Sequence, residues 1–265
     1  MMDALRERIE RALESFSTDD AAPLLSESMR YSLLGGGKRI RPCLLLLVCD
    51  MLGGREADAL PFACALEMIH CYSLIHDDLP AMDDDPIRRG RPSNHVRFGE
   101  ANAILAGDGL LTKAALLLSK QSGFDDAKRA ILEGAYAMVS GQSDDLNRSD
   151  KSAETLERIH ARKTGALFRA ACAAGAYLSD PSRAEEMEAF GDTLGLLFQM
   201  TDDLLDAARD REEGKLTYVT YYGETDTARF VADAANRASA IIKPYHGAAA
   251  DTLRALIAAL KTRTE

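Results

Sequence analysis

Apolar residues recur at three- and four-residue spacing along almost the whole chain, which is the pattern of amphipathic helices. Turn signals interrupt the pattern, for example "GREADAL" around Gly54 and "LSDPSR" around Pro181. No linker is long enough to separate domains, so we predict that residues 1–265 form one all-α domain, a bundle of about ten helices. The helices are predicted at residues 2–16, 22–34, 41–53, 57–78, 98–120, 125–142, 153–178, 183–208, 224–242 and 248–262.

The composition agrees with this fold and limits the partners. Ala and Leu, two strong helix formers, are abundant, and 46% of the residues are hydrophobic. The net charge of −10 argues against a nucleic acid as partner. A small anionic ligand stays possible, because local charge and not net charge determines a binding site.

Cysteines and apolar runs indicate the compartment. The five cysteines are odd in number, form no CxxC motif and lie in apolar stretches, so we expect reduced thiols in a cytoplasmic protein. The start "MMDALRERIE" is amphipathic and acidic, unlike a signal peptide. No uncharged apolar run approaches the roughly 20 residues of a membrane span, so none is expected.

The stretch "SLIHDDLPAMDDDPIRRGRPS" places a first aspartate cluster at the end of an apolar helix. Asp77 and Asp83 lie about 240° apart on an ideal helix and would not share a face. Pro80 removes an N–H group and clashes with the carbonyl of His76, so the helix should end or kink there. A loosened turn is then expected to bring Asp83 back toward Asp77.

A second cluster, "FQMTDDLLD", has a different geometry. Asp202 and Asp206 are four residues apart and share a helix face with Gln199. A solvated acidic stripe is the simplest alternative, but the flanking residues are apolar, so the carboxylates need a neutralising partner. Carboxylates are hard ligands for Mg²⁺, which commonly also binds substrate phosphates. Basic residues that could contact the same polyphosphate are Lys38, Arg39, Arg41, Arg88, Arg89, Arg162, Lys163 and Lys215.

These clusters belong to a longer series of motifs that resembles the trans-isoprenyl diphosphate synthases, in particular the short-chain bacterial farnesyl diphosphate synthase type. The resemblance runs from about Leu33 to Gly223. It depends on "GGGKRIRP", "EMIHCYSLIHDDLPAMDDDPIRRGRPS", "ILAGDGLL", "GQSDDL", "LERIHARKTGALFRA" and "FQMTDDLLD".

The resemblance implies a bundle of helices around a deep central cavity, usually as a homodimer. It implies Mg²⁺ as cofactor, about three ions with substrate bound, and isopentenyl diphosphate and allylic diphosphates as substrates. The implied metal ligands are Asp77, Asp78, Asp83, Asp202, Asp203 and Asp206. The implied allylic diphosphate site contains Arg88, Lys163, Thr164, Gln199 and Lys215. The implied isopentenyl diphosphate site contains Lys38, Arg41, His70 and Arg89.

Two residues before the first cluster are expected to determine product length. With the diphosphate at Asp77, the growing chain runs back along the helix, past the small Ser73 and toward the bulky Tyr72. In the family these two positions set chain length, and a Tyr-Ser pair resembles farnesyl producers. We therefore expect dimethylallyl and then geranyl diphosphate to be extended to farnesyl diphosphate, although Tyr72 could be only core packing.

Four alternatives remain open. The product could be geranyl or geranylgeranyl diphosphate, and a class I terpene cyclase would share the aspartate chemistry. Against the cyclase, Lys38, Arg41 and His70 are retained. A non-catalytic partner subunit is the fourth alternative, although both aspartate motifs persist. The segment "AARDREEGKLTY" after the second motif is shorter than usual in the family, and it retains only one lysine, Lys215.

Overall fold

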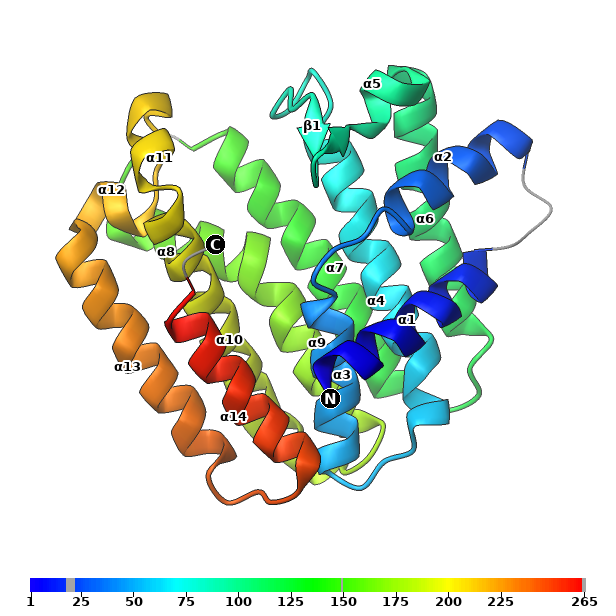
Figure 1. The fold of residues 1–265 in the computed structure, drawn as a ribbon, viewed down its shortest axis with the longest axis vertical. Helices are drawn as coiled ribbons and strands as arrows, with labels where there is room; N and C mark the ends of the chain where they lie inside the picture. Colours follow the sequence, from blue (N-terminus) through cyan, green and yellow to red (C-terminus); the bar gives the residue numbers. More distant parts are fainter. Residues whose placement is uncertain (18–21, 149, 264–265) are drawn as a thin grey trace.

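All ten predicted helices are present in the computed structural model, which describes residues 1–17, 22–148 and 150–263. They form a bundle in which most helices run roughly along one direction (Figure 1). The long helices are α1 (Met2–Ser17), α2 (Pro23–Leu33), α3 (Ile40–Met51), α4 (Glu56–Asp77), α6 (Glu100–Ser119), α7 (Asp125–Leu146), α8 (Ala153–His160), α9 (Ala166–Tyr177), α10 (Ala184–Leu205), α13 (Glu224–Ile242) and α14 (Ala248–Lys261). The all-α prediction is confirmed.

The core lies where α3, α4 and α9 meet the helices around them. In α3 the run from Pro42 to Cys49 is buried without interruption, and α9 is rich in Ala and buried on nearly all sides. Small side chains let α9 pack closely against α3, α7 and α10. The five cysteines are free and buried in this core.

The pattern did not predict the short elements. These are α5 (Asn94–Phe98), α11 (Ala207–Glu213), α12 (Tyr218–Tyr222), the 3₁₀ turn η2 (Pro181–Arg183) and the strands β1 (Ile87–Arg88) and β2 (Arg91–Pro92). The predicted helix 153–178 is continuous, but it contains the π-helical segment η1 (Ala161–Gly165) between α8 and α9. Figure 1 shows β1, α11 and α12 at the same end of the bundle.

The two strands form a hairpin that holds the arginines after the first aspartate cluster. Arg88 pairs with Arg91, which leaves a two-residue turn at Arg89 and Gly90. Both turn residues have positive φ, 54° and 72°, as a type I′ turn requires. Gly90 adopts this conformation at no steric cost, and the turn directs Arg88 and Arg89 to different parts of the molecule.

By length and composition alone, two helices of the described residues could cross a membrane, α4 and α6. Burial explains the apolar character of α4, because 67% of its apolar window lies inside the bundle. For α6 the share is only 33%. Its exposed apolar side chains therefore require a separate explanation.

Candidate functional site

Two adjoining cavities contain most of the predicted site residues. The first, here the apolar cavity, has a volume of about 360 Å³ and lies between α4 and α7. Its walls include Tyr72, Ser73, Asp77, Met138 and Gln142. The second, here the acidic cavity, has a volume of about 460 Å³. It is lined by Asp83 of the first aspartate cluster, by all three aspartates of the second cluster, Asp202, Asp203 and Asp206, and by the cationic residues Arg88 and Lys215. Lys163 and Thr164 of η1 line both cavities.

The first aspartate cluster folds back as predicted. Helix α4 ends at Asp77, and the backbone N–H of Asp83 donates to the carbonyl of Asp77 at 2.9 Å. Burial raises the pKa of Asp77 to about 6; Lys163 lowers it and Asp83 raises it further. Burial therefore disfavours the charged form of the Asp77 carboxyl group, and a bound cation would favour it.

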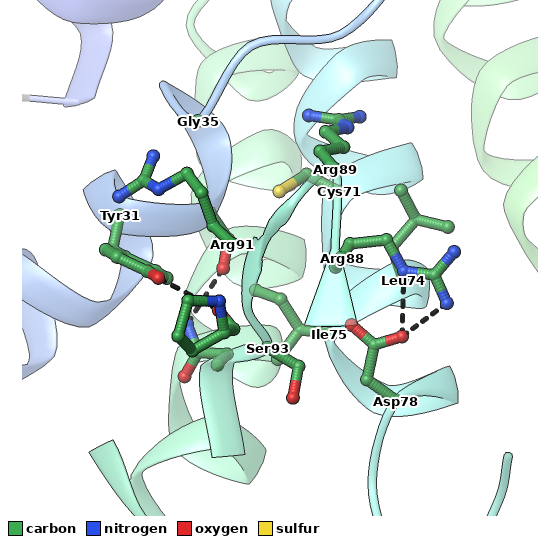
Figure 2. Close-up of a pocket in the computed structure, with 13 residues that line it drawn as sticks. Tyr31, Gly35, Cys71, Leu74, Ile75, Asp78, Arg88, Arg89, Arg91 and Ser93 are labelled. Atoms are coloured by element: carbon green, nitrogen blue, oxygen red, sulfur yellow. Dashed lines mark hydrogen bonds and ion pairs between the residues drawn. The ribbon is translucent and has the colours of Figure 1, made fainter. Parts of the chain in front are cut away.

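Asp78 lies on the other side of the α4 end and is bound to Arg88. The Nε atom of Arg88 donates to Oδ1 of Asp78 at 2.9 Å, and Figure 2 shows this pair beneath the hairpin. The side chain of Asp78 is only 3% exposed. This ion pair attaches the hairpin to α4, so Asp78 has a structural partner besides its predicted role as a metal ligand.

Arg89 meets the glycine loop of "GGGKRIRP". Its Nη1 atom donates to the carbonyl of Gly36, and a Cβ atom at Gly37 would lie 2.7 Å from the guanidinium. Glycine is therefore needed at position 37 for this close approach. In Figure 2 Arg89 extends away from Asp78. The structure thus brings Arg89 and the loop before Lys38 together, as the prediction of a shared anion site requires.

Arg41 and His70 lie at the other wall of the apolar cavity. Nη1 of Arg41 is 3.3 Å from Nε2 of His70, and its guanidinium lies 4.6 Å from the ring centre of Phe168. Burial lowers the pKa of Arg41 to about 10, and burial together with Arg41 lowers the pKa of His70. Arg41 is thus a buried cation beside a neutral imidazole, and a buried charge needs an oppositely charged partner.

Arg39 is a structural residue rather than a site residue. Its Nη1 atom donates to Glu67 at 2.6 Å, and its Nε atom donates to Glu10 at 2.7 Å. The side chain is fully buried, and it ties α1 and α4 to the loop before α3. Its exposed neighbour Lys38 lies near Arg263 and Asp202, and burial and Arg263 lower the pKa of Lys38.

The three aspartates of the second cluster have three different environments. Asp202 is bound by Arg263, and burial raises its pKa against the lowering effect of that arginine. Asp206 caps the end of α10 and lies 3.4 Å from Nη2 of Arg209. Asp203 accepts hydrogen bonds from Nε2 of Gln199 at 2.8 Å and from the backbone N–H of Tyr218 at 2.7 Å. Burial raises the pKa of Asp203 to about 7.

The π-helical segment η1 presents Lys163 and Thr164 to the site. Nζ of Lys163 donates to Asp145 at 2.8 Å, and the hydroxyl of Thr164 donates to Oε1 of Gln199 at 2.6 Å. A π-bulge adds a residue to the helix and often marks a functional site. A Cβ atom at Gly141 would lie 2.3 Å from the backbone nitrogen of Lys163, so glycine is needed where α7 passes η1.

Sequence reasoning left three contributing residues unassigned. Asp145 and Gln142 lie in "GQSDDL", which was among the matching stretches, so a signal for them existed. Arg263 has no local motif, and its contact with Asp202 spans 61 residues of sequence. Only the packing of α14 against α10 brings these two side chains together.

Buried polar atoms without a partner gather at the two cavities. In the described part of the chain such atoms occur on Arg6, Arg41, Gln142 and His160, and the last three residues line a cavity. An unsatisfied buried polar group costs about 1–3 kcal/mol. The cluster is therefore poorly explained by folding stability alone and is typical of a binding site.

The carboxylates fit a divalent cation that is shared with a ligand. No three acidic, His or Cys side chains among the described residues converge to hold an ion by themselves. The acidic cavity is nevertheless rich in carboxylates and cationic side chains, and Mg²⁺ usually takes one or two carboxylates plus substrate phosphates. The donor set thus suits Mg²⁺ bridged to a polyphosphate.

Comparison with known proteins agrees with this chemistry. A family model described as Polyprenyl synthetase matches residues 22–219. The farnesyl diphosphate synthase of Micrococcus luteus is 44% identical over 220 residues, which cover 75% of this chain and 76% of that protein. The large subunit 1 of the heterodimeric geranylgeranyl pyrophosphate synthase of Arabidopsis thaliana is 42% identical over 252 residues, covering 83% of this chain and 68% of that protein.

A solved structure covers nearly the whole chain. The geranyltranstransferase of Thermotoga maritima superimposes with a TM-score of 0.87 at 32% identity, covering 99% of both chains. The chain is shorter than its plant relatives and spans between 58% and 68% of the length of four Arabidopsis synthases.

Proposed function

Because the chain belongs to the polyprenyl synthetase family of prenyltransferases, we propose that it condenses isopentenyl diphosphate head to tail with an allylic diphosphate. The allylic substrate is dimethylallyl and then geranyl diphosphate, and the product is farnesyl diphosphate. The observation that carries the proposal is the junction of the two cavities at Lys163 and Thr164. An allylic substrate whose diphosphate group lies in the acidic cavity would extend its hydrocarbon chain into the apolar cavity.

The six aspartates have two different proposed roles, metal binding and support of the surrounding backbone. Asp77, Asp83, Asp202 and Asp206 would hold Mg²⁺, about three ions with substrate bound. Bound Mg²⁺ supplies stabilisation of the charge that builds on the diphosphate leaving group. Asp78 and Asp203, each only 2% exposed, would hold the hairpin and α12 in place around that group.

Cationic side chains bind the two diphosphates. Lys163, oriented by Asp145, binds the allylic diphosphate together with Lys215 and Arg88, which line the same cavity. The isopentenyl diphosphate is bound by Lys38, Arg41, His70 and Arg89. Holding both substrates converts a bimolecular encounter into a reaction between positioned groups.

Carbon–carbon bond formation follows breakage of the allylic C–O bond, which leaves an allylic cation and a diphosphate. The Thr164 hydroxyl donates a hydrogen bond to Oε1 of Gln199, so its oxygen lone pairs are free to face the cation. The double bond of isopentenyl diphosphate then attacks the cation. The resulting cation loses a proton to the departed diphosphate, which forms the new double bond.

Ser73 and Tyr72 set the length of the product. Ser73 is small, and its hydroxyl donates to the carbonyl of His70 at 2.9 Å, so it leaves the first turn of the cavity open. Tyr72, its neighbour in sequence, is only 5% exposed and also lines the cavity, so its bulky ring would stop the growing chain there. On the basis of this Tyr-Ser pair we propose a C15 product.

Geranylgeranyl or geranyl diphosphate synthesis is the second candidate, since curated relatives carry both farnesyl and geranylgeranyl names. A partner subunit of weak activity is disfavoured because both aspartate clusters line the cavities. Incubation with Mg²⁺, isopentenyl diphosphate and dimethylallyl diphosphate tests the proposal. Chromatography of the dephosphorylated products should show mainly farnesol, whereas absence of any prenyl alcohol would refute the activity.

We further propose a cytoplasmic homodimer. Exposed apolar side chains lie on α6 and α7, both of which pack against α4: Ile104, Leu105, Leu116, Leu132 and Tyr136. So many exposed apolar groups on two helices suit a protein interface. A second copy of the chain would cover them.

A further inference from the structure

His76 connects the expected floor of the apolar cavity to α6. Its ring lies edge-on to that of Tyr72, one helical turn earlier on α4, with centroids 5.8 Å apart and an interplanar angle of 75°. Its Nε2 atom lies 3.0 Å from the carbonyl oxygen of Ile104, to which it can only donate. Both rings line the apolar cavity.

Because Gly107 has no side chain, the His76 ring can lie directly against α6. A Cβ atom at position 107 would lie 2.1 Å from Nε2 of His76 and 2.5 Å from Cδ2. The ring is therefore in contact with the α6 backbone on one side and with Tyr72 on the other. As long as it stays there, Tyr72 cannot swing toward α6 and open the cavity.

We propose that His76 is a positioning residue for product length, because it holds Tyr72 across the end of the apolar cavity. This inference rests on the proposed function, since it concerns the length of the prenyl chain. It assigns the length determinant to a contact between two helices rather than to side chains of α4 alone. Removing the ring leaves a space beside α6 into which Tyr72 can turn, and the cavity becomes longer.

Product length distinguishes this role from simple packing. A variant that only weakens the fold makes less product of the same length, whereas a displaced Tyr72 changes the length itself. We expect His76→Ala to raise the ratio of C20 to C15 products at least tenfold over wild type. His76→Gln retains a donor near the Nε2 position and should restore the wild-type ratio. The exposed His246→Ala serves as the matched control and should match wild type.

Gly107→Ala tests the same contact in the opposite direction. The added methyl group pushes the ring away from α6 toward the cavity, so the product should shift toward C10.

Circular dichroism verifies that each variant is folded. An unchanged product ratio in folded His76→Ala, or a Gln variant that behaves like the Ala variant, overturns the proposal. If wild type forms no prenyl diphosphate at all, the proposed function fails and this inference fails with it; if wild type forms one and the ratios do not move, only this inference fails.

Discussion

Asp202 and Asp203 are adjacent in sequence and both line the acidic cavity, but they have different hydrogen-bond partners. Asp202 meets the cationic side chain of Arg263 and lines the acidic cavity. Asp203 is 2% exposed and accepts hydrogen bonds from a backbone N–H of α12 and from the side chain of Gln199. Successive helical residues point about 100° apart, so one aspartate of a pair can serve a ligand while the other serves the fold. A motif assigned as a whole therefore hides two roles.

Asp203 should make the stability of the ligand-free protein depend on pH. Its pKa is raised from 3.8 to about 7 by burial, so the folded state binds more protons than the unfolded state between those values. The free energy of unfolding then falls as pH rises through this window, by at most about 4 kcal/mol. Asp203→Asn removes the titrating group. We expect its melting temperature, measured without Mg²⁺, to fall less than that of wild type as the pH rises from about 4 to about 8. Parallel curves for both proteins would contradict the assignment.

Asp77 should be needed for turnover but not for folding. Its carboxylate is buried with a raised pKa, so its charge does not stabilise the folded protein. Asp77→Ala should lower kcat by about 10³-fold or more, because it removes a ligand of the ions that neutralise the leaving group. Its melting temperature should equal or exceed that of wild type. Steady-state kinetics and calorimetry measure both quantities, and near-wild-type turnover would exclude Asp77 from the reaction.

At the scale of elements, the long helices were predictable because most carry a periodic apolar face, and some, such as α3 and α13, end shortly before a Gly or Pro. Short elements were not, since α5 and α12 have five residues each and too few positions for a period. The π-helical segment also escaped, because its sequence "ARKTG" fits an ordinary helix and only the close passage of Gly141 reveals the bulge. The turn that brings Asp83 back to Asp77 was predictable from Pro80, because the proline ring locally prevents the helix from continuing.

The short segment between α10 and α12 contains one lysine, Lys215, and it should be critical. Lys215 follows Gly214, whose φ of 67° ends α11, and it lines the acidic cavity. With no second lysine in the segment, Lys215→Ala should lower kcat/KM for the allylic substrate by about 100-fold. Lys120→Ala, on an exposed helix end far along the chain, is the matched control and should have no effect. A mild effect at position 215 would mean that this side chain does not contact the diphosphate.

At the scale of the whole molecule, the exposed apolar groups on α6 and α7 remain to be covered. Tyr136 is 76% exposed, the highest value among the large apolar and aromatic side chains that stand out from the described surface. A charge at the centre of an apolar interface is desolvated without a partner, so Tyr136→Glu should prevent association. Sedimentation velocity should give a dimer for wild type and a monomer for this variant. Tyr221→Glu, on α12 and 43% exposed, should stay dimeric. A monomeric wild type, or a dimeric Tyr136→Glu, would place the interface elsewhere or remove it, and the exposed face of α6 would then need another partner.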